Sequence, residues 1–206
     1  MTTARMETPT KPAYLELLNR ISVAESRAGV YLKAWADVTP EPELRAALNF
    51  VAARETSHGA VFCQLISRLG FCVEETEDPK FAEQQRLYGD PTIADAEKVR
   101  YGRYGREEGA IERALAAIDE RCTDESVDAL TRDTLRWYVH EERDSGELLR
   151  PIYACVTGAM SASTGQATTP STDATAIMGC MTAGFASLQQ SLKELAESLS
   201  KTARSK

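Results

Sequence analysis

The sequence predicts an all-α protein organised as a four-helix bundle, and three observations lead to this fold class. Apolar residues recur at alternating intervals of three and four along four long stretches, which is the spacing of one buried helix face. Glycine and proline are few, 12 and 8 of 206 residues, and they concentrate between these stretches. The hydrophobic fraction of 43% is enough for a core. A chain of this length fits one domain with an appendage.

The first half of the chain predicts two neighbouring helices. Residues 1–12 are polar and rich in threonine, so we expect a disordered N-terminus. The first helix then runs to about residue 38. The Thr-Pro-Glu-Pro turn at residues 39–42 ends it, because proline cannot continue a helix, and begins a second helix that ends at Gly70. So short a connection makes the two helices antiparallel neighbours.

The stretch at residues 71–93 interrupts the helical pattern. It contains an acidic turn, a short helical segment at 81–88 and the breaker Gly89-Asp90-Pro91. A connection of this length can run the full height of a bundle. We therefore expect a long crossover between the second and third helices.

Two further long helices are predicted after the crossover. The third runs over residues 93–122 and is weakened by Gly102, Gly105 and Gly109. The fourth runs over residues 126–156, and Pro151 bends it late. The expected buried stripe of the third helix contains Tyr104, Glu108, Ile111, Leu115, Ile118 and Cys122. That of the fourth contains Val127, Leu130, Thr134, Trp137, Glu141, Asp144 and Leu148.

The C-terminal region is predicted to be separate from the bundle, which spans residues 13–157. Residues 158–175 are rich in serine, threonine, alanine and glycine, the composition of a flexible linker. Residues 176–206 then predict an amphipathic helix with one narrow apolar seam. Because an isolated helix of this length is marginal in water, we expect it to pair with a second copy of the chain. A homo-oligomer, formed through the bundle or this helix, is therefore expected.

Charge and cysteine usage exclude several classes of function. The net charge of −7 and the absence of a Lys/Arg cluster argue against nucleic acid as a partner. Five cysteines without a Cys-x-x-Cys pair exclude a disulfide framework, a zinc ribbon and a rubredoxin-like iron site. The N-terminus lacks an apolar segment, and no apolar run is long enough for a membrane span. We therefore expect a cytoplasmic protein without a membrane partner.

Acidic residues interrupt the apolar stripe at mid-height on all four long helices. Burying a carboxylate is costly unless it is paired or bound to a metal, so this coincidence predicts a metal site. Carboxylate oxygens together with imidazole favour iron, with manganese as the alternative. The candidate ligands are Glu25, Glu55, His58, Glu108, Glu112, Glu141 and Asp144.

The register of the fourth helix stays open. His140 and Glu142 flank Glu141, and a slip of one residue brings Glu142 inward in its place. The ordinary alternative for each single residue is a glutamate that reaches from the helix edge to water, or a hydrogen-bonded core histidine.

The arrangement of one Glu followed by Glu-x-x-His, repeated over four helices, resembles the ferritin-like superfamily of carboxylate-bridged di-iron proteins. The second acid on the third helix is most similar to rubrerythrin-type proteins. The resemblance implies bridging carboxylates at Glu55 and Glu141, terminal ligands at Glu25 and Glu108, His58 on one metal, and Glu112 as an extra ligand. The chain departs from this pattern in three respects. Asp144 stands where the family has a second histidine, and Glu112 follows Glu108 by four residues, where rubrerythrin has a spacing of three. The rubredoxin domain of rubrerythrin is also lacking.

The resemblance implies a non-haem oxidoreductase with two iron ions, or manganese, that activates dioxygen or peroxide and receives electrons from an external donor. Tyr31 and Tyr104 are candidate catalytic residues near the metals, although interhelical packing explains each of them as well. One alternative is a di-iron oxygenase, which needs a substrate pocket beside the metals. The other is a metal-storing or metal-free helical bundle that acts by assembly through its C-terminal helix.

Overall fold

The computed structural model describes residues 10–75, 77–103 and 109–158, all of which belong to the first of two units, residues 1–162. This part of the chain is all-α, with six helices and no strand. The helices are α1 (Leu15–Val38), α2 (Pro42–Arg68), α3 (Pro79–Gly89), α4 (Asp95–Arg103), α5 (Ala110–Arg121) and α6 (Ala129–Val156). The expected C-terminal helix and almost all of the expected linker lie outside the described residues.

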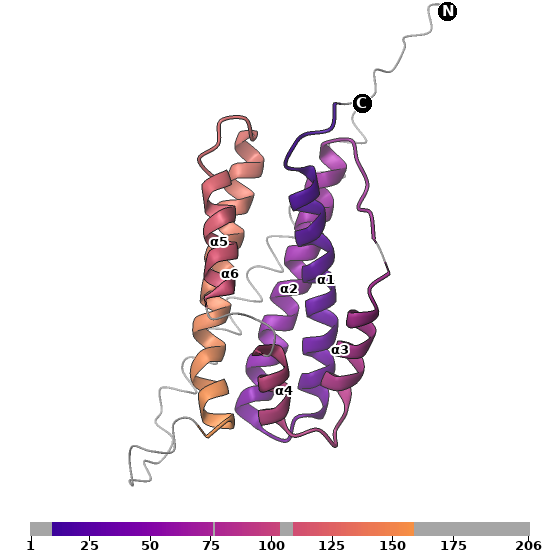
Figure 1. Ribbon diagram of the computed structural model, residues 1–206, viewed down its shortest axis with the longest axis vertical. Coiled ribbons are helices and arrows are strands. Elements are labelled where there is room, and N and C mark those ends of the chain that lie inside the picture. The colour runs from indigo at the N-terminus through magenta and orange to yellow at the C-terminus, as the bar shows by residue number, and fades with distance from the viewer. Residues whose placement is uncertain (1–9, 76, 104–108, 159–206) are drawn as a thin grey trace, which may run out of the picture. The chain divides into compact units, whose positions relative to one another are not determined.

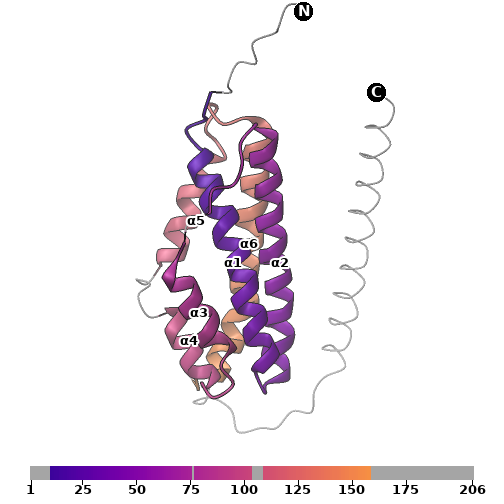
Figure 2. The ribbon, with the colours of Figure 1, turned by 90° about the vertical axis from the view of Figure 1, so that its right-hand side faces the viewer.

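Helices α1 and α2 are antiparallel neighbours, as the short turn between them predicts (Figure 2). They approach closely because small residues face each other. A Cβ on Gly59 would lie 3.0 Å from the Ser26 backbone nitrogen, and one on Gly29 would lie 3.0 Å from the Ala52 carbonyl oxygen. The Ser22 hydroxyl also donates a hydrogen bond to the Gly59 carbonyl oxygen over 3.0 Å.

The predicted crossover contains α3, which lies against α1 (Figure 1). Asp78 begins this helix, because its side chain accepts a hydrogen bond from the Lys80 amide. The following turn is held to α1 by Asp95, whose two carboxylate oxygens each accept a hydrogen bond of 2.6 Å, from the Trp35 indole and from the Thr39 hydroxyl.

The predicted third helix is not continuous. Helix α4 ends at Arg103 and α5 begins at Ala110, with residues 104–108 outside the described part of the chain. Gly109 precedes α5 with a φ of 73°, a left-handed conformation that glycine adopts at low cost and that a continuous helix does not contain. The stripe is correspondingly shortened: Leu115, Ile118 and Cys122 are buried, whereas Ile111 is 51% exposed.

Helix α6 is continuous through Pro151, and α5 packs against it. Most of its buried positions lie one residue further along the chain than the predicted stripe. Leu135, Tyr138 and Ser145 are buried, whereas Leu130 and Trp137, which the predicted stripe places in the core, are 43% and 38% exposed. Thr131 is also buried, and its amide donates to Asp128, the residue that caps the helix.

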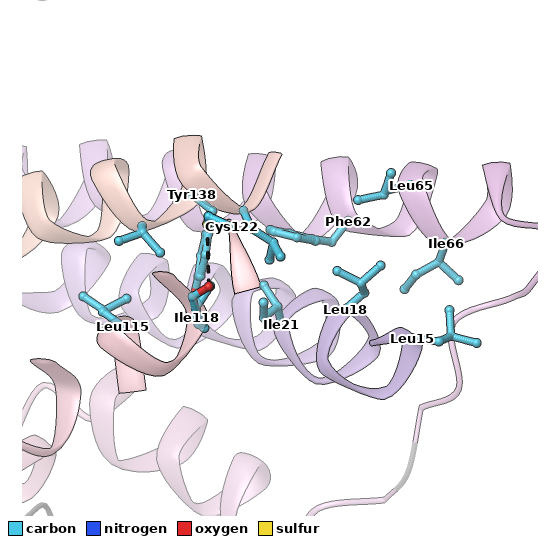
Figure 3. Packing of buried hydrophobic residues seen from close by; sticks show 12 residues of the cluster. Leu15, Leu18, Ile21, Phe62, Leu65, Ile66, Leu115, Ile118, Cys122 and Tyr138 are labelled. Atoms are coloured by element: carbon cyan, nitrogen blue, oxygen red, sulfur yellow. Dashed lines mark hydrogen bonds between the residues drawn. The ribbon is translucent and has the colours of Figure 1, made fainter. Parts of the chain in front are cut away.

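Two apolar clusters form the core. The first joins the N-terminal half of α1, the C-terminal half of α2, α5 and the first half of α6, and contains Leu18, Phe62 and Tyr138 (Figure 3). The second contains Leu32, Trp35, Leu48 and Tyr88, with the last turns of α6 packed on it. The polar residues at mid-height of α1, α2 and α6 fall between these clusters. None of the helices in the described ranges has the length and apolarity of a membrane span.

Candidate metal centre

Four side chains with metal-binding atoms meet between the two apolar clusters. They are Glu25 from α1, Glu55 and His58 from α2, and Glu142 from α6, and each offers one ligand atom within 4.8 Å of the other three. Glu25 is 7% exposed, Glu55 5% and His58 0%. Three of the predicted ligands are therefore together, and Glu142 is the fourth member of the group.

The close contact of α1 and α2 brings the first three residues together. Glu25 lies between Ser22 and Gly29 on α1, and Glu55 and His58 precede Gly59 on α2. Because Gly59 has no side chain, the two backbones can approach closely at this position. Both glutamates therefore reach the same point. Glu55 and His58 are three residues apart, so they share one face of α2.

Arg54 explains why α6 presents Glu142, not Glu141, to the site. Its Nε lies 2.9 Å from the Glu141 carboxylate, and its Nη2 donates to Asp144 over 3.0 Å. Its Nη1 donates to the Glu141 carbonyl oxygen and to the Ser145 hydroxyl. The guanidinium thus holds Glu141 and Asp144, the two predicted ligands of α6, beside α2. Glu142, which follows Glu141 in the chain, points into the interior.

The observed register of α6 also changes how this helix repeats the Glu-x-x-His pattern of α2. Glu142 corresponds to Glu55, and three residues later Ser145 corresponds to His58. Ser145 is buried and occupied by its hydrogen bond from Arg54. Among the described residues, the group therefore contains one imidazole.

Several buried polar atoms at the site lack a hydrogen-bond partner. They are one carboxylate oxygen of Glu55, one of Glu142 and both ring nitrogens of His58. His58 Nδ1 lies 3.2 Å from Glu142 and 3.6 Å from Glu55 without making a hydrogen bond to either. An unsatisfied buried polar atom costs about 1–3 kcal/mol, and four at one point are not explained by packing. A cation bound by the two carboxylate oxygens and one ring nitrogen of His58 satisfies three of them, and the other nitrogen of a neutral imidazole carries a hydrogen.

The His58 ring is held by aromatic side chains. The Trp137 and Tyr138 rings lie edge-on to it, with centroids 5.0 and 5.2 Å away. Although Trp137 is partly exposed, its ring restricts the orientation of the imidazole. The Tyr138 hydroxyl donates a hydrogen bond of 2.7 Å to Glu25. Sequence reasoning missed Tyr138, although its position one turn before Glu142 places it on the same helix face.

Burial and mutual repulsion make the carboxyl groups hold protons. Burial, followed by the neighbouring Glu55 carboxylate, raises the pKa of Glu25 to about 10. Burial, with a contribution from Glu142, raises the pKa of Glu55 to about 7, while Glu25 and Arg54 act in the opposite direction. Burial and the same carboxylates raise the pKa of Tyr138. Without a cation the group therefore retains protons at neutral pH.

The described part of the chain places Glu112 and Tyr31 outside this group of four. The Glu112 side chain is 65% exposed and lies 3.9 Å from Arg143. Glu108 and Tyr104 lie outside the described residues. Tyr31 lies on the wall of a cavity that also includes Glu142 and Glu112.

Comparison with known proteins gives no relative: the chain matches no protein-family model, no curated protein and no solved structure.

Proposed function

We propose that this protein binds redox-active metal ions in a ferritin-like helical bundle and acts as a non-haem oxidoreductase on dioxygen or peroxide. The observation that carries the proposal is the convergence of Glu25, Glu55, His58 and Glu142, whose ligand atoms are buried and in part without partners. A buried site with three carboxyl groups and one imidazole favours a divalent or trivalent cation.

The ligand set favours iron, with manganese as the alternative. Oxygen donors with one imidazole suit these ions better than copper(I) or a structural zinc, which favour sulfur or several imidazoles. We propose two ions, as in the proteins the sequence resembles. Glu25, Glu55, His58 and Glu142 would hold them, and Glu108, outside the described residues, stays a further ligand predicted from the sequence.

A bound pair of such ions supplies electron transfer to dioxygen or peroxide. The chain contributes four features to that chemistry. Glu55 and Glu142 hold the ions, and the apolar clusters on either side limit water. The Tyr138 hydroxyl donates a hydrogen bond of 2.7 Å to Glu25 and thereby orients that carboxyl group. Trp137 and Tyr138 fix the plane of the His58 ring.

A di-iron oxygenase is the second candidate, because a cavity of about 340 Å³ lies beside Glu142. An oxygenase needs space for an organic substrate next to its metals, whereas an enzyme that acts on peroxide needs only a narrow channel. The alternative of an assembly protein depends on residues 176–206, which lie outside the described part of the chain.

The proposal is tested with full-length protein from cells grown with added iron or manganese. We expect metal to be retained through gel filtration, and the ferrous protein, prepared without air, to consume dioxygen or peroxide when either is added. A Glu55→Ala variant that folds like the wild type should lose metal and this consumption. Wild-type protein that retains neither iron nor manganese after reconstitution refutes the proposal. Metal retained without consumption of either oxidant leaves storage as the function and refutes the oxidoreductase.

A further inference from the structure

The cavity beside Glu142 has an aromatic wall. Four side chains form a continuous column of stacked rings in the order Tyr31, Tyr88, Trp35 and Tyr153, with centroids 5.2, 5.2 and 5.7 Å apart and interplanar angles of 16–28°. All four line the cavity. Its volume of about 340 Å³ is at the lower end of the range for ligand sites, roughly 300–1,000 Å³. Such a space accepts one small molecule with a flat apolar body.

A buried ammonium lies on the same cavity. Lys98 from α4 is 1% exposed and donates one hydrogen bond, of 2.9 Å, to the Tyr88 carbonyl oxygen. That bond caps the end of α3, which accounts for one of the three N–H groups of the ammonium. Burial lowers the pKa of Lys98, while Asp95 and Asp90 favour its charged form. A buried ammonium with further donors is best satisfied by an anionic oxygen.

We propose that the cavity between Lys98 and Glu142 binds a small planar carboxylate, such as an aryl carboxylate. Its carboxylate pairs with Lys98, and its ring lies against the aromatic column. The opposite end of the molecule then faces Glu142 and the metal group. This inference rests on the proposed function in one respect only, that Glu142 is a metal ligand. The ligand site itself is defined by the column and by Lys98.

Gly146 gives a way to close the cavity without disturbing the metal group. It lies on the cavity wall in α6, four residues after Glu142, and a Cβ at this position meets nothing within 4 Å. Gly146→Phe therefore fills space in the cavity, whereas Gly146→Ala adds one methyl group there. Neither change removes a hydrogen bond or an ion pair.

Benzoate and its neutral counterpart benzamide are the probes, titrated into full-length protein by calorimetry. A charge-assisted hydrogen bond contributes about 1.5–3 kcal/mol, so benzoate should bind about ten- to a hundredfold more tightly than benzamide. Gly146→Phe should abolish benzoate binding, and Gly146→Ala should leave it within about twofold. Lys98→Met, which keeps the apolar stem, should remove the preference for benzoate. Lys98→Met also removes the hydrogen bond to the Tyr88 carbonyl oxygen. If this variant does not fold, the comparison of benzoate with benzamide on the wild type decides whether a carboxylate is recognised.

Equal affinities for the two probes refute the inference, and so does benzoate binding that Gly146→Phe leaves unchanged. Benzoate affinity that requires added metal and ignores Lys98→Met places the carboxylate on the metal and also refutes it. Metal content, measured on the same samples, separates this outcome from the proposed function. Protein that binds benzoate as expected but retains no metal keeps the ligand site and loses the proposed function.

Discussion

The metal-free protein should become less stable as the pH rises from 5 to 8, which is opposite to the usual behaviour of carboxylates. Glu25 has an ordinary pKa of 4.5 when the chain is unfolded and about 10 in the folded protein. The folded state therefore binds more protons than the unfolded state between these values, and the free energy of unfolding falls with pH throughout that window. Glu55 acts in the same direction up to its pKa of about 7.

The size of the effect follows from the linkage between protons and folding. Each pH unit over which one extra proton is bound changes stability by about 1.4 kcal/mol. Between pH 4.5 and pH 7, Glu25 alone lowers the free energy of unfolding by about 3 kcal/mol. Glu55 shares the same environment, so the two contributions are not additive.

Urea unfolding of metal-free protein, followed by circular dichroism at pH 5, 6, 7 and 8, measures this effect. Glu25→Gln, which cannot ionise, should flatten the slope and should raise the stability at pH 8 relative to the wild type. Added metal should reverse the slope, because the ion competes with protons for the same oxygens. Stability of the metal-free protein that rises with pH, or a slope that Glu25→Gln leaves unchanged, refutes the reasoning.

Two further predictions concern the packing that builds the site. Arg54→Met should lower stability by about 2 kcal/mol, since α6 loses its ion pairs and hydrogen bonds to α2; Arg54→Lys should restore little, because an ammonium lacks the planar fork. Unchanged urea midpoints for both variants contradict this role. Gly59→Ala should cost about 1–3 kcal/mol by separating α1 from α2, whereas Gly146→Ala, with open space around its Cβ, should add about 1 kcal/mol. Similar effects of the two alanines contradict the close contact.

Periodicity predicted the elements that are long and well punctuated. The Thr-Pro-Glu-Pro turn divides α1 from α2, and Glu25, Glu55 and His58 interrupt their stripes without ambiguity. The short helix in the stretch at residues 71–93 was also predicted, with α3 beginning at Pro79 instead of Phe81. Local sequence sufficed in these segments because the apolar pattern has only one consistent face.

The errors have physical causes that lie outside the local pattern. On α6 two adjacent faces carry nearly the same pattern of apolar residues. The predicted face, through Trp137 and Glu141, is shifted by one residue from the face that is buried. The choice is made by Arg54, 87 residues away in the chain, which takes Glu141 for an ion pair. The predicted third helix is interrupted at Gly109, because the positive φ of this residue does not continue a right-handed helix.

The most direct test of the metal centre compares two adjacent alanine variants on α6. Glu142→Ala removes a side chain of the buried group, and Glu141→Ala removes the neighbouring carboxylate, which pairs with Arg54 outside that group. Iron and manganese are measured in each variant after identical reconstitution, with circular dichroism as the control for folding. Glu142→Ala should lose most of the metal, and Glu141→Ala should retain it. Retention by Glu142→Ala together with loss by Glu141→Ala contradicts the assignment of Glu142 as the ligand.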